Sequence, residues 1–295
     1  MHFYRNGNYT VCIMEDGTKI RKNDLDYFDP DFAENVDVCI TKKCSQNCKF
    51  CYEGCNINGK HGNILSYKFL DTLHPYTELA LNGNDMDHPQ LIQFLNKLKE
   101  RKVFANMTVN QNQFMNNIEL IKRLIEDKLI YGIGISYSHY NEEFLNEVKK
   151  LNNAVLHTIN GIITLNDLKK IKGENLKILI LGYKNIRRGS DYLESNHKEV
   201  TDNQQDLYDN LETIVKENWF KVVSFDNLAI NQLKVKRLMS QEEWESFYMG
   251  DDGNFTFYID MVNGEFSKNS CEIEKRYKID NLSIDDMFNK IKEII

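Results

Sequence analysis

The sequence predicts an α/β protein built on a parallel sheet. Short β-rich runs alternate with segments of helical periodicity, and these runs lie at 36–41, 78–81, 103–109, 131–136, 154–160, 176–181 and 220–225. The chain has 295 residues, a length that a single α/β barrel commonly reaches. It contains no low-complexity tract and no linker rich in Gly, Ser or Pro. We therefore expect one large domain with appendages.

Residues 1–35 predict a small β-meander that precedes this core. Tyr9, Val11 and Ile13 alternate with polar residues. The dipeptides Asn6-Gly7 and Asp16-Gly17 are of the kind that type I′ hairpin turns prefer. The β-rich core is then expected over residues 36–227.

The helices of the core are predicted from apolar spacing and from their first residues. Pro89 is expected at the first position of one helix, whose apolar face includes Leu91 and Leu98. Asn141 and Asn166 are expected to cap two later helices. A further helix is marked by Leu207, Leu211, Ile214 and Val215.

Residues 228–295 depart from the alternation and predict a cap. A hairpin is expected over 254–267, with its turn at Asn263-Gly264. Ser283 and Asp286 have the spacing of a capping box for a final amphipathic helix. We expect this C-terminal hairpin plus helix to cover one end of a barrel.

Composition restricts the partners and the compartment. The chain carries 37 Lys+Arg and 44 Asp+Glu, a net charge of −7, and no basic stripe, so nucleic acid is not an expected partner. No run of 18 apolar residues and no signal-peptide pattern occurs, so we expect a cytoplasmic protein without a membrane partner. Four of the seven cysteines lie within twelve residues, which favours a metal site over disulfides. Cys12, Cys39 and Cys271 are expected to be scattered core thiols.

Cys44, Cys48 and Cys51 form the pattern C-x3-C-x2-C directly after the apolar run at 36–41. Three thiolates this close can hold one metal centre, and a [4Fe–4S] cluster on three cysteines keeps one iron open to another ligand. Zinc is the alternative, with Cys55 as the fourth thiolate, although structural zinc sites usually combine two C-x2-C knuckles on separate segments. We expect Cys55 to be a bystander.

The spacing C-x3-C-x-Φ-C, with the aromatic Phe50 before the last cysteine, resembles the radical S-adenosylmethionine (SAM) superfamily. The resemblance implies a partial (β/α)6 TIM-like barrel over about residues 36–227, with a [4Fe–4S] cluster on Cys44, Cys48 and Cys51. It implies an oxygen-sensitive enzyme that reductively cleaves SAM to a 5′-deoxyadenosyl radical, which abstracts hydrogen from a peptide or other small substrate. A flavodoxin- or ferredoxin-type protein is the implied electron donor.

The resemblance also implies where SAM binds. Asn82, Gly83 and Asn84 stand where the family carries Gly-Gly-Glu, whose acid receives the methionine ammonium. Asn84 lacks that charge, and Asp85 is the candidate to compensate. The remaining cofactor-binding positions that we expect are Phe50, Tyr52, Asn110, Ser136, His157 and Leu181. For His157 a satisfied core histidine is the alternative.

Residues 254–271 resemble the opening of the SPASM extension of peptide-modifying members, of whose cluster cysteines only Cys271 is present. No auxiliary cluster is therefore expected. Lys184, Arg187 and Arg188 follow the sixth strand and would either bind an anionic substrate group or be solvated. Two other functions stay open, namely a zinc-stabilised non-catalytic binding module and a degenerate cluster-binding member that cleaves SAM weakly.

Overall fold

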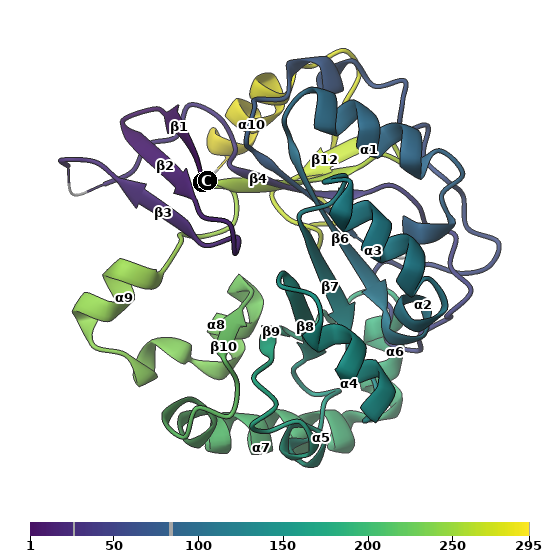
Figure 1. Cartoon of the computed structure of the whole chain (residues 1–295), viewed down its shortest axis with the longest axis vertical. Helices are drawn as coiled ribbons and strands as arrows, with labels where there is room; N and C mark the ends of the chain where they lie inside the picture. Colours follow the sequence, from purple (N-terminus) through teal and green to yellow (C-terminus); the bar gives the residue numbers. More distant parts are fainter. Residues whose placement is uncertain (26, 83–84, 295) are drawn as a thin grey trace.

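One mostly parallel sheet organises the molecule (Figure 1). The structure, a computed structural model, describes residues 1–25, 27–82 and 85–294. Neighbouring strands pair in parallel in chain order, as the alternation predicts: β4 (Asn35–Cys39), β5 (Glu78–Asn82), β6 (Phe104–Asn110), β7 (Gly132–Ser136), β8 (Ala154–Ile159), β9 (Lys177–Leu181) and β10 (Val222–Phe225). The sheet is open, since β10 forms one of its edges, so closure into a barrel remains a prediction.

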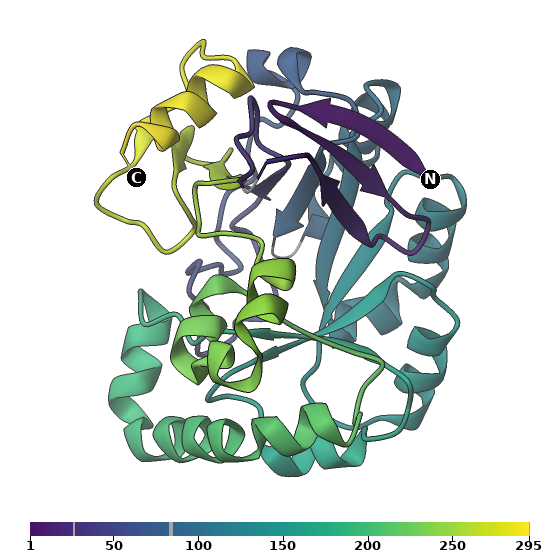
Figure 2. The ribbon, with the colours of Figure 1, turned by 90° about the vertical axis from the view of Figure 1, so that its left-hand side faces the viewer.

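Helices cover one face of this sheet (Figures 1 and 2). Strand residues on that face, such as Val38, Met107 and Ile135, are buried with apolar helix residues in two large clusters. The helices of the core are α1 (Leu91–Glu100), α2 (Gln111–Asn116), α3 (Ile118–Glu126), α4 (Glu142–Lys149), α5 (Leu165–Lys170), α6 (Arg188–Ser195), α7 (His197–Lys216) and α8 (Asn227–Leu233). In the described part of the chain, no helix is both long enough and apolar enough to span a bilayer.

The other face of the sheet is polar and half-exposed. Alternate residues on neighbouring strands, among them Asp37, Asn82, Thr108 and Ser136, share this face because strand side chains alternate. The interior of a typical TIM barrel is filled by bulky branched side chains. Here the face opposite the helices, which we call the inner face, carries mostly small and polar groups on β4 to β7 and aliphatic residues on β8 and β9, namely Val155, Ile159, Leu179 and Leu181.

The N-terminal β-meander is confirmed. β1 (His2–Asn6), β2 (Tyr9–Ile13) and β3 (Lys19–Lys22) form an antiparallel three-stranded sheet. Tyr9, Val11 and Ile13 pack against Phe104 and Phe255 at the amino ends of β6 and of a C-terminal strand. The meander therefore lies at the end of the large sheet opposite the carboxyl ends of its strands.

The C-terminal hairpin extends the sheet, where the sequence predicts a cover over one end. β11 (Thr256–Asp260) pairs in parallel with β4, and β12 (Glu265–Ser267) and β13 (Tyr277–Lys278) follow in antiparallel order. The physical reason is that β4 would otherwise leave its backbone groups unpaired at an edge. The final helix, α10 (Ile284–Lys292), begins with the predicted Ser283 capping box and buries Met287 and Phe288.

Two predicted helix starts are wrong. α1 begins at Leu91 rather than Pro89, because the His88 ring accepts a hydrogen bond from the Gln90 N–H at 3.1 Å and holds the preceding residues in a turn. α5 is capped by Thr164 rather than Asn166, because the Thr164 hydroxyl accepts from the Asp167 N–H. The Asn141 cap is confirmed, with Phe144 N–H as donor at 2.8 Å. Further elements are η1 (Lys68–Thr72), η2 (Asp85–Asp87), η3 (Val235–Leu238) and α9 (Gln241–Phe247).

Candidate functional site

The cysteines lie on a loop at the carboxyl end of β4, which we call the cysteine loop (residues 41–61). Backbone hydrogen bonds close it at its base, from Cys44 N–H to Asn56 O at 2.9 Å and from Lys42 N–H to Lys60 O at 2.9 Å. Gly59 is required at this base, since a Cβ there would lie 1.9 Å from Lys42 O. The loop is thus a closed, turn-rich unit beside the inner face of the sheet.

The three predicted ligands, Cys44, Cys48 and Cys51, are half-exposed, whereas Cys55 is buried. Burial, with the neighbouring Cys51 and Cys44 thiols, raises the pKa of Cys48. The Cys55 thiol and then the Arg188 guanidinium lower the pKa of Cys51 to about 5. The loop therefore brings the four thiols near enough to influence one another, and Cys55 is a direct neighbour of Cys51 rather than remote from it.

Among the described residues, no three His, Cys, Asp or Glu side chains converge on a single ion. Four thiolates on one zinc would lie roughly 3.8 Å apart, from a Zn–S distance of about 2.3 Å. In an iron–sulfur cube each cysteine binds a different iron, so the ligands stand further apart than those sharing an ion. Three neighbouring thiols on one loop are a donor set that fits a cube with one open iron.

The cations after β9 hold the cysteine loop. Arg187 Nη1 donates to Tyr52 O at 2.7 Å, and Arg188 donates to Asn47 Oδ1 and to Cys55 O. From the sequence we expect these residues either to be solvated or to bind an anionic substrate group. In the structure both arginines donate hydrogen bonds to the cysteine loop. They tie α6 to both sides of the Cys48–Cys51 turn.

Lys184, in the turn between β9 and α6, reaches the same loop. Its Nζ lies 3.9 Å from the centre of the Tyr52 ring and donates to Ser270 Oγ at 3.1 Å. Burial opposes its charge, but the electrostatic influence of Tyr52, Cys271 and the nearby carboxyls leaves the pKa of Lys184 raised. Lys184 thus joins the cysteine loop to the segment that follows β12.

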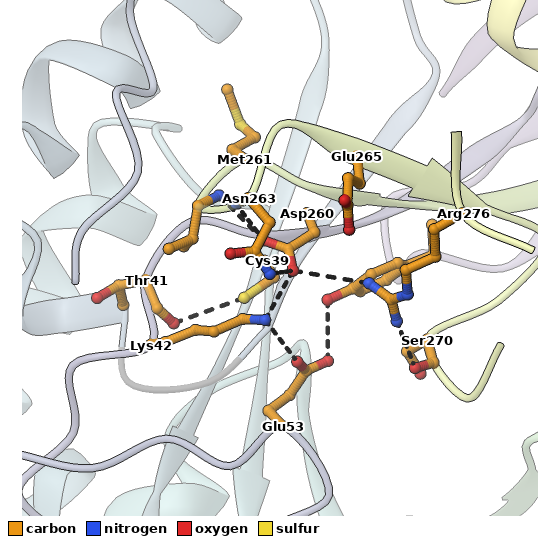
Figure 3. A network of polar contacts seen from close by, with 12 residues as sticks. Cys39, Thr41, Lys42, Glu53, Asp260, Met261, Asn263, Glu265, Ser270 and Arg276 are labelled. Atoms are coloured by element: carbon orange, nitrogen blue, oxygen red, sulfur yellow. Dashed lines mark hydrogen bonds and ion pairs between the residues drawn. The ribbon is translucent and has the colours of Figure 1, made fainter. Parts of the chain in front are cut away.

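A buried ion network fixes the base of the cysteine loop to the C-terminal hairpin (Figure 3). Asp260, at the end of β11, is fully buried and accepts from Lys42 Nζ at 2.7 Å. Arg276 Nη1 lies 3.6 Å from the same carboxylate. Glu53 accepts from Tyr258 Oη at 3.0 Å, and burial raises the pKa of its carboxyl. The hairpin therefore holds the loop at Lys42 and at Glu53, on both sides of the three cysteines.

The structure brings Asn110, Ser136 and His157 together on the inner face. They pair in register across β6, β7 and β8 at the carboxyl ends of these strands. The Asn110 side chain also caps α2 by accepting from Asn112 N–H at 2.8 Å. Ser136 lies between the other two, so this row presents an amide, a hydroxyl and an imidazole.

The His157 ring packs over Gly134 of β7, which has no side chain. A Cβ at Gly134 would lie 2.2 Å from the His157 ring, so the ring occupies the space above that glycine. Burial lowers the pKa of His157 to about 4, which keeps the imidazole neutral near pH 7. A neutral ring offers one donor and one acceptor to a ligand.

The other predicted positions are more dispersed. Phe50 contacts the Tyr192 ring of α6 edge to face, at 5.8 Å between centroids, and Asn82 ends β5 in register with Cys39. Leu181 ends β9 opposite Ile159. The predicted Gly83 and Asn84 lie outside the described residues.

The sequence did not identify Asp37 or Asp260 as site residues. Asp37 lies on the inner face of β4, and burial raises the pKa of its carboxyl to about 6. The available signal was a carboxylate inside an apolar strand, which holds for Asp37 and Asp260 alike. Arg188 was named as a candidate to bind an anionic substrate group, and the structure instead bonds it to Asn47 and Cys55 of the cysteine loop.

Comparison with known proteins gives a fold and no family. No family model matches the chain, and no curated protein matches it. Among solved structures, Streptococcus suis SuiB bound to S-adenosylmethionine aligns with a TM-score of 0.52 at 11% identity. The alignment covers 81% of this chain and 61% of SuiB, so the chain spans about three fifths of that protein.

A second solved structure, MGS-M4, an aldo-keto reductase from a Medee basin deep-sea metagenome library, is similar at a TM-score of only 0.29 and 8% identity over 96% of this chain. That score is too low to relate the two folds. The chain therefore shares its α/β fold with SuiB.

Proposed function

We propose that this chain is a radical SAM enzyme, whose cysteine loop holds a [4Fe–4S] cluster and whose inner face receives S-adenosylmethionine. The observation that carries the proposal is the position of three neighbouring thiols at the carboxyl end of β4, beside a polar, half-exposed sheet face. Active sites of barrel-like α/β folds lie at this end of the strands. SuiB, which has this fold, has been solved with SAM bound.

Cys44, Cys48 and Cys51 would hold the cluster, with the fourth iron open to SAM. When bound, the cluster and SAM supply reductive cleavage of a carbon–sulfur bond and hence a radical able to abstract hydrogen. The chain's own task is to position these groups and to keep water and other hydrogen donors away. Lys42 and Glu53, held by the C-terminal hairpin, and Arg187 and Arg188 keep the loop in place.

The inner-face row supplies polar contacts for the nucleotide. Ser136 offers a hydroxyl to a ribose or carboxylate, and the neutral His157 ring offers a flat surface and one donor. Asn82, at the end of β5, leads to the predicted Asn82-Gly83-Asn84 position for the methionine ammonium. Phe50, Tyr52 and Leu181 complete the proposed set.

Anaerobic reconstitution with iron and sulfide tests the proposal. We expect brown protein whose absorbance bleaches with dithionite, whose electron paramagnetic resonance (EPR) spectrum changes on adding SAM, and which releases 5′-deoxyadenosine under reductant. Cys44→Ala, Cys48→Ala and Cys51→Ala should each lose the cluster. Cys12→Ala, in β2 of the meander, is the matched control and should retain it. Wild-type protein that takes up no iron would refute the proposal.

The same measurements separate the two alternatives. Colourless protein with one bound zinc would identify a zinc-stabilised binding module. A cluster without nucleoside release would identify a degenerate member, and Asn84→Glu then tests whether the missing acid is the cause. A peptide or other small molecule is the proposed substrate, and a flavodoxin- or ferredoxin-type protein is the proposed cytoplasmic electron donor.

A further inference from the structure

The turn between β9 and α6 carries backbone strain at the residue that precedes Arg188. Arg187 has φ 48° and ψ −131°, a conformation that residues with a side chain rarely adopt. The turn is held by a hydrogen bond from Gly189 N–H to Ile186 O at 3.0 Å and by one from Tyr183 Oη to Gly189 O at 2.7 Å. The strained backbone directs two consecutive arginines onto the cysteine loop.

Arg188 contacts the cysteine loop on both sides of the Cys48–Cys51 turn. Its Nη atoms donate to Asn47 Oδ1 and to Cys55 O. After the Cys55 thiol, its guanidinium also lowers the pKa of Cys51, as a side-chain hydrogen-bond donor to that thiol, and it acts electrostatically on the Cys48 thiol. Within the described part of the chain, its Nε is buried and has no hydrogen-bond acceptor. A buried donor without an acceptor is costly, so this N–H needs an acceptor close to it, and the Cys51 sulfur, which the same guanidinium already reaches, fits that role.

We propose that Arg188 donates its Nε–H to the Cys51 sulfur when the cluster is bound, and that this contact raises the cluster's reduction potential. The inference rests on the proposed function. Reduction moves one electron from a donor such as dithionite to the cluster, and no bond forms or breaks. Because the cluster becomes more negative, a cation and a hydrogen bond at one of its sulfur ligands stabilise the reduced form.

Arg187 provides the matched control, because it reaches the same loop without reaching a sulfur. It donates to the backbone oxygen of Tyr52, and its side chain lies 3.4 Å from the position of a Cβ at Gly54. Removing Arg187 should loosen the loop and lower the iron content. It should leave the potential of the loaded fraction unchanged.

The test is a redox titration, followed by EPR, of anaerobically reconstituted wild type, Arg188→Met and Arg187→Met. We expect Arg188→Met to shift to a more negative potential, so that the ratio of reduced to oxidised cluster falls about tenfold at a fixed potential, which is about 59 mV for one electron. A purely structural role would lower iron content without moving the potential. If Arg188→Met does not load iron, Arg188→Gln, which retains a donor without charge, should show the same direction of shift.

The outcomes separate this inference from the proposed function. Wild-type protein without a cluster would overturn both. A loaded wild type whose potential is unchanged in Arg188→Met, or in Arg188→Gln where only that variant loads, would overturn the inference and leave the proposed function standing. An equal shift in Arg187→Met would also overturn it, because the effect would then come from loop order rather than from the sulfur contact.

Discussion

Replacing Asp260 by Asn tests whether the C-terminal hairpin holds the cysteine loop. The buried Asp260 carboxylate accepts from Lys42 Nζ at 2.7 Å and from the backbone N–H groups of Val262 and Asn263, each at 3.0 Å. Asn has a similar shape without the charge. Among the described acidic side chains, Lys42 would then keep Glu53, whose Oε2 lies 4.0 Å away.

The expected loss of stability follows from this geometry. Removing one partner of a buried ion pair costs about 3–5 kcal/mol. Since Glu53 still compensates part of the Lys42 charge, we expect the free energy of unfolding to fall by about 3 kcal/mol, the lower end of that range. With an unfolding entropy of about 2.1 cal/mol/K per residue, each kcal/mol lowers the melting temperature of a chain of 295 residues by about 1.6 °C, so Asp260→Asn should melt about 5 °C below wild type.

Urea unfolding and thermal melting of the metal-free chain measure this loss. Lys278→Ala is the matched control on the same hairpin, because it removes an exposed ion pair with Glu265 at 2.7 Å, worth about 0–1 kcal/mol. Asp260→Asn should also lower iron uptake on reconstitution, since the base of the cysteine loop loses its tether. If Asp260→Asn and Lys278→Ala melt at the same temperature, the network does not hold the loop.

Three other predictions follow from particular contacts. Burial lowers the pKa of His157 to about 4 in the folded chain, so its contribution to stability is complete above about pH 6.5 and is lost as the pH falls toward 4. We expect a loss of about 2 kcal/mol between pH 7 and pH 5 that His157→Asn abolishes, and equal slopes in urea titrations of both proteins would contradict this. Gly134→Ala places a Cβ 2.2 Å from the His157 ring and should cost about 1–3 kcal/mol and weaken SAM binding measured by calorimetry, whereas unchanged affinity would mean that the ring position does not matter. Ser283→Ala removes the α10 capping box and should cost about 1 kcal/mol in urea unfolding, with Ser283→Thr near wild type; a loss below about 0.3 kcal/mol would show that the cap is dispensable.

Much of the fold was predictable because its signals are local. The parallel strands β4 to β10 follow from short β-rich runs, and the turn at Asn263-Gly264 and the Ser283 cap follow from residues close together in the chain. The errors at Pro89 and Asn166 were also local, since the adjacent His88 ring binds the Gln90 N–H ahead of α1, and Thr164, two residues before Asn166, caps α5. Such competition depends on rotamers, which a sequence pattern does not encode.

The candidate site was predictable in part. The row of Asn110, Ser136 and His157 follows from strand ends, because the carboxyl ends of parallel strands meet at one edge of the sheet. The partners of the cysteine loop were not predictable, because Lys42 and Asp260 are 218 positions apart and Arg188 and Asn47 are 141 apart.

By itself, the sequence determined the order of the strands and helices and the presence of three closely spaced thiols after the first core strand, because these are properties of neighbouring residues. Only the tertiary structure decided that the C-terminal hairpin joins β4, that Asp260 and Arg188 hold the cysteine loop, and that Gly134 makes room for the His157 ring. These contacts depend on strand register and on the paths of distant segments, which packing of the whole chain selects.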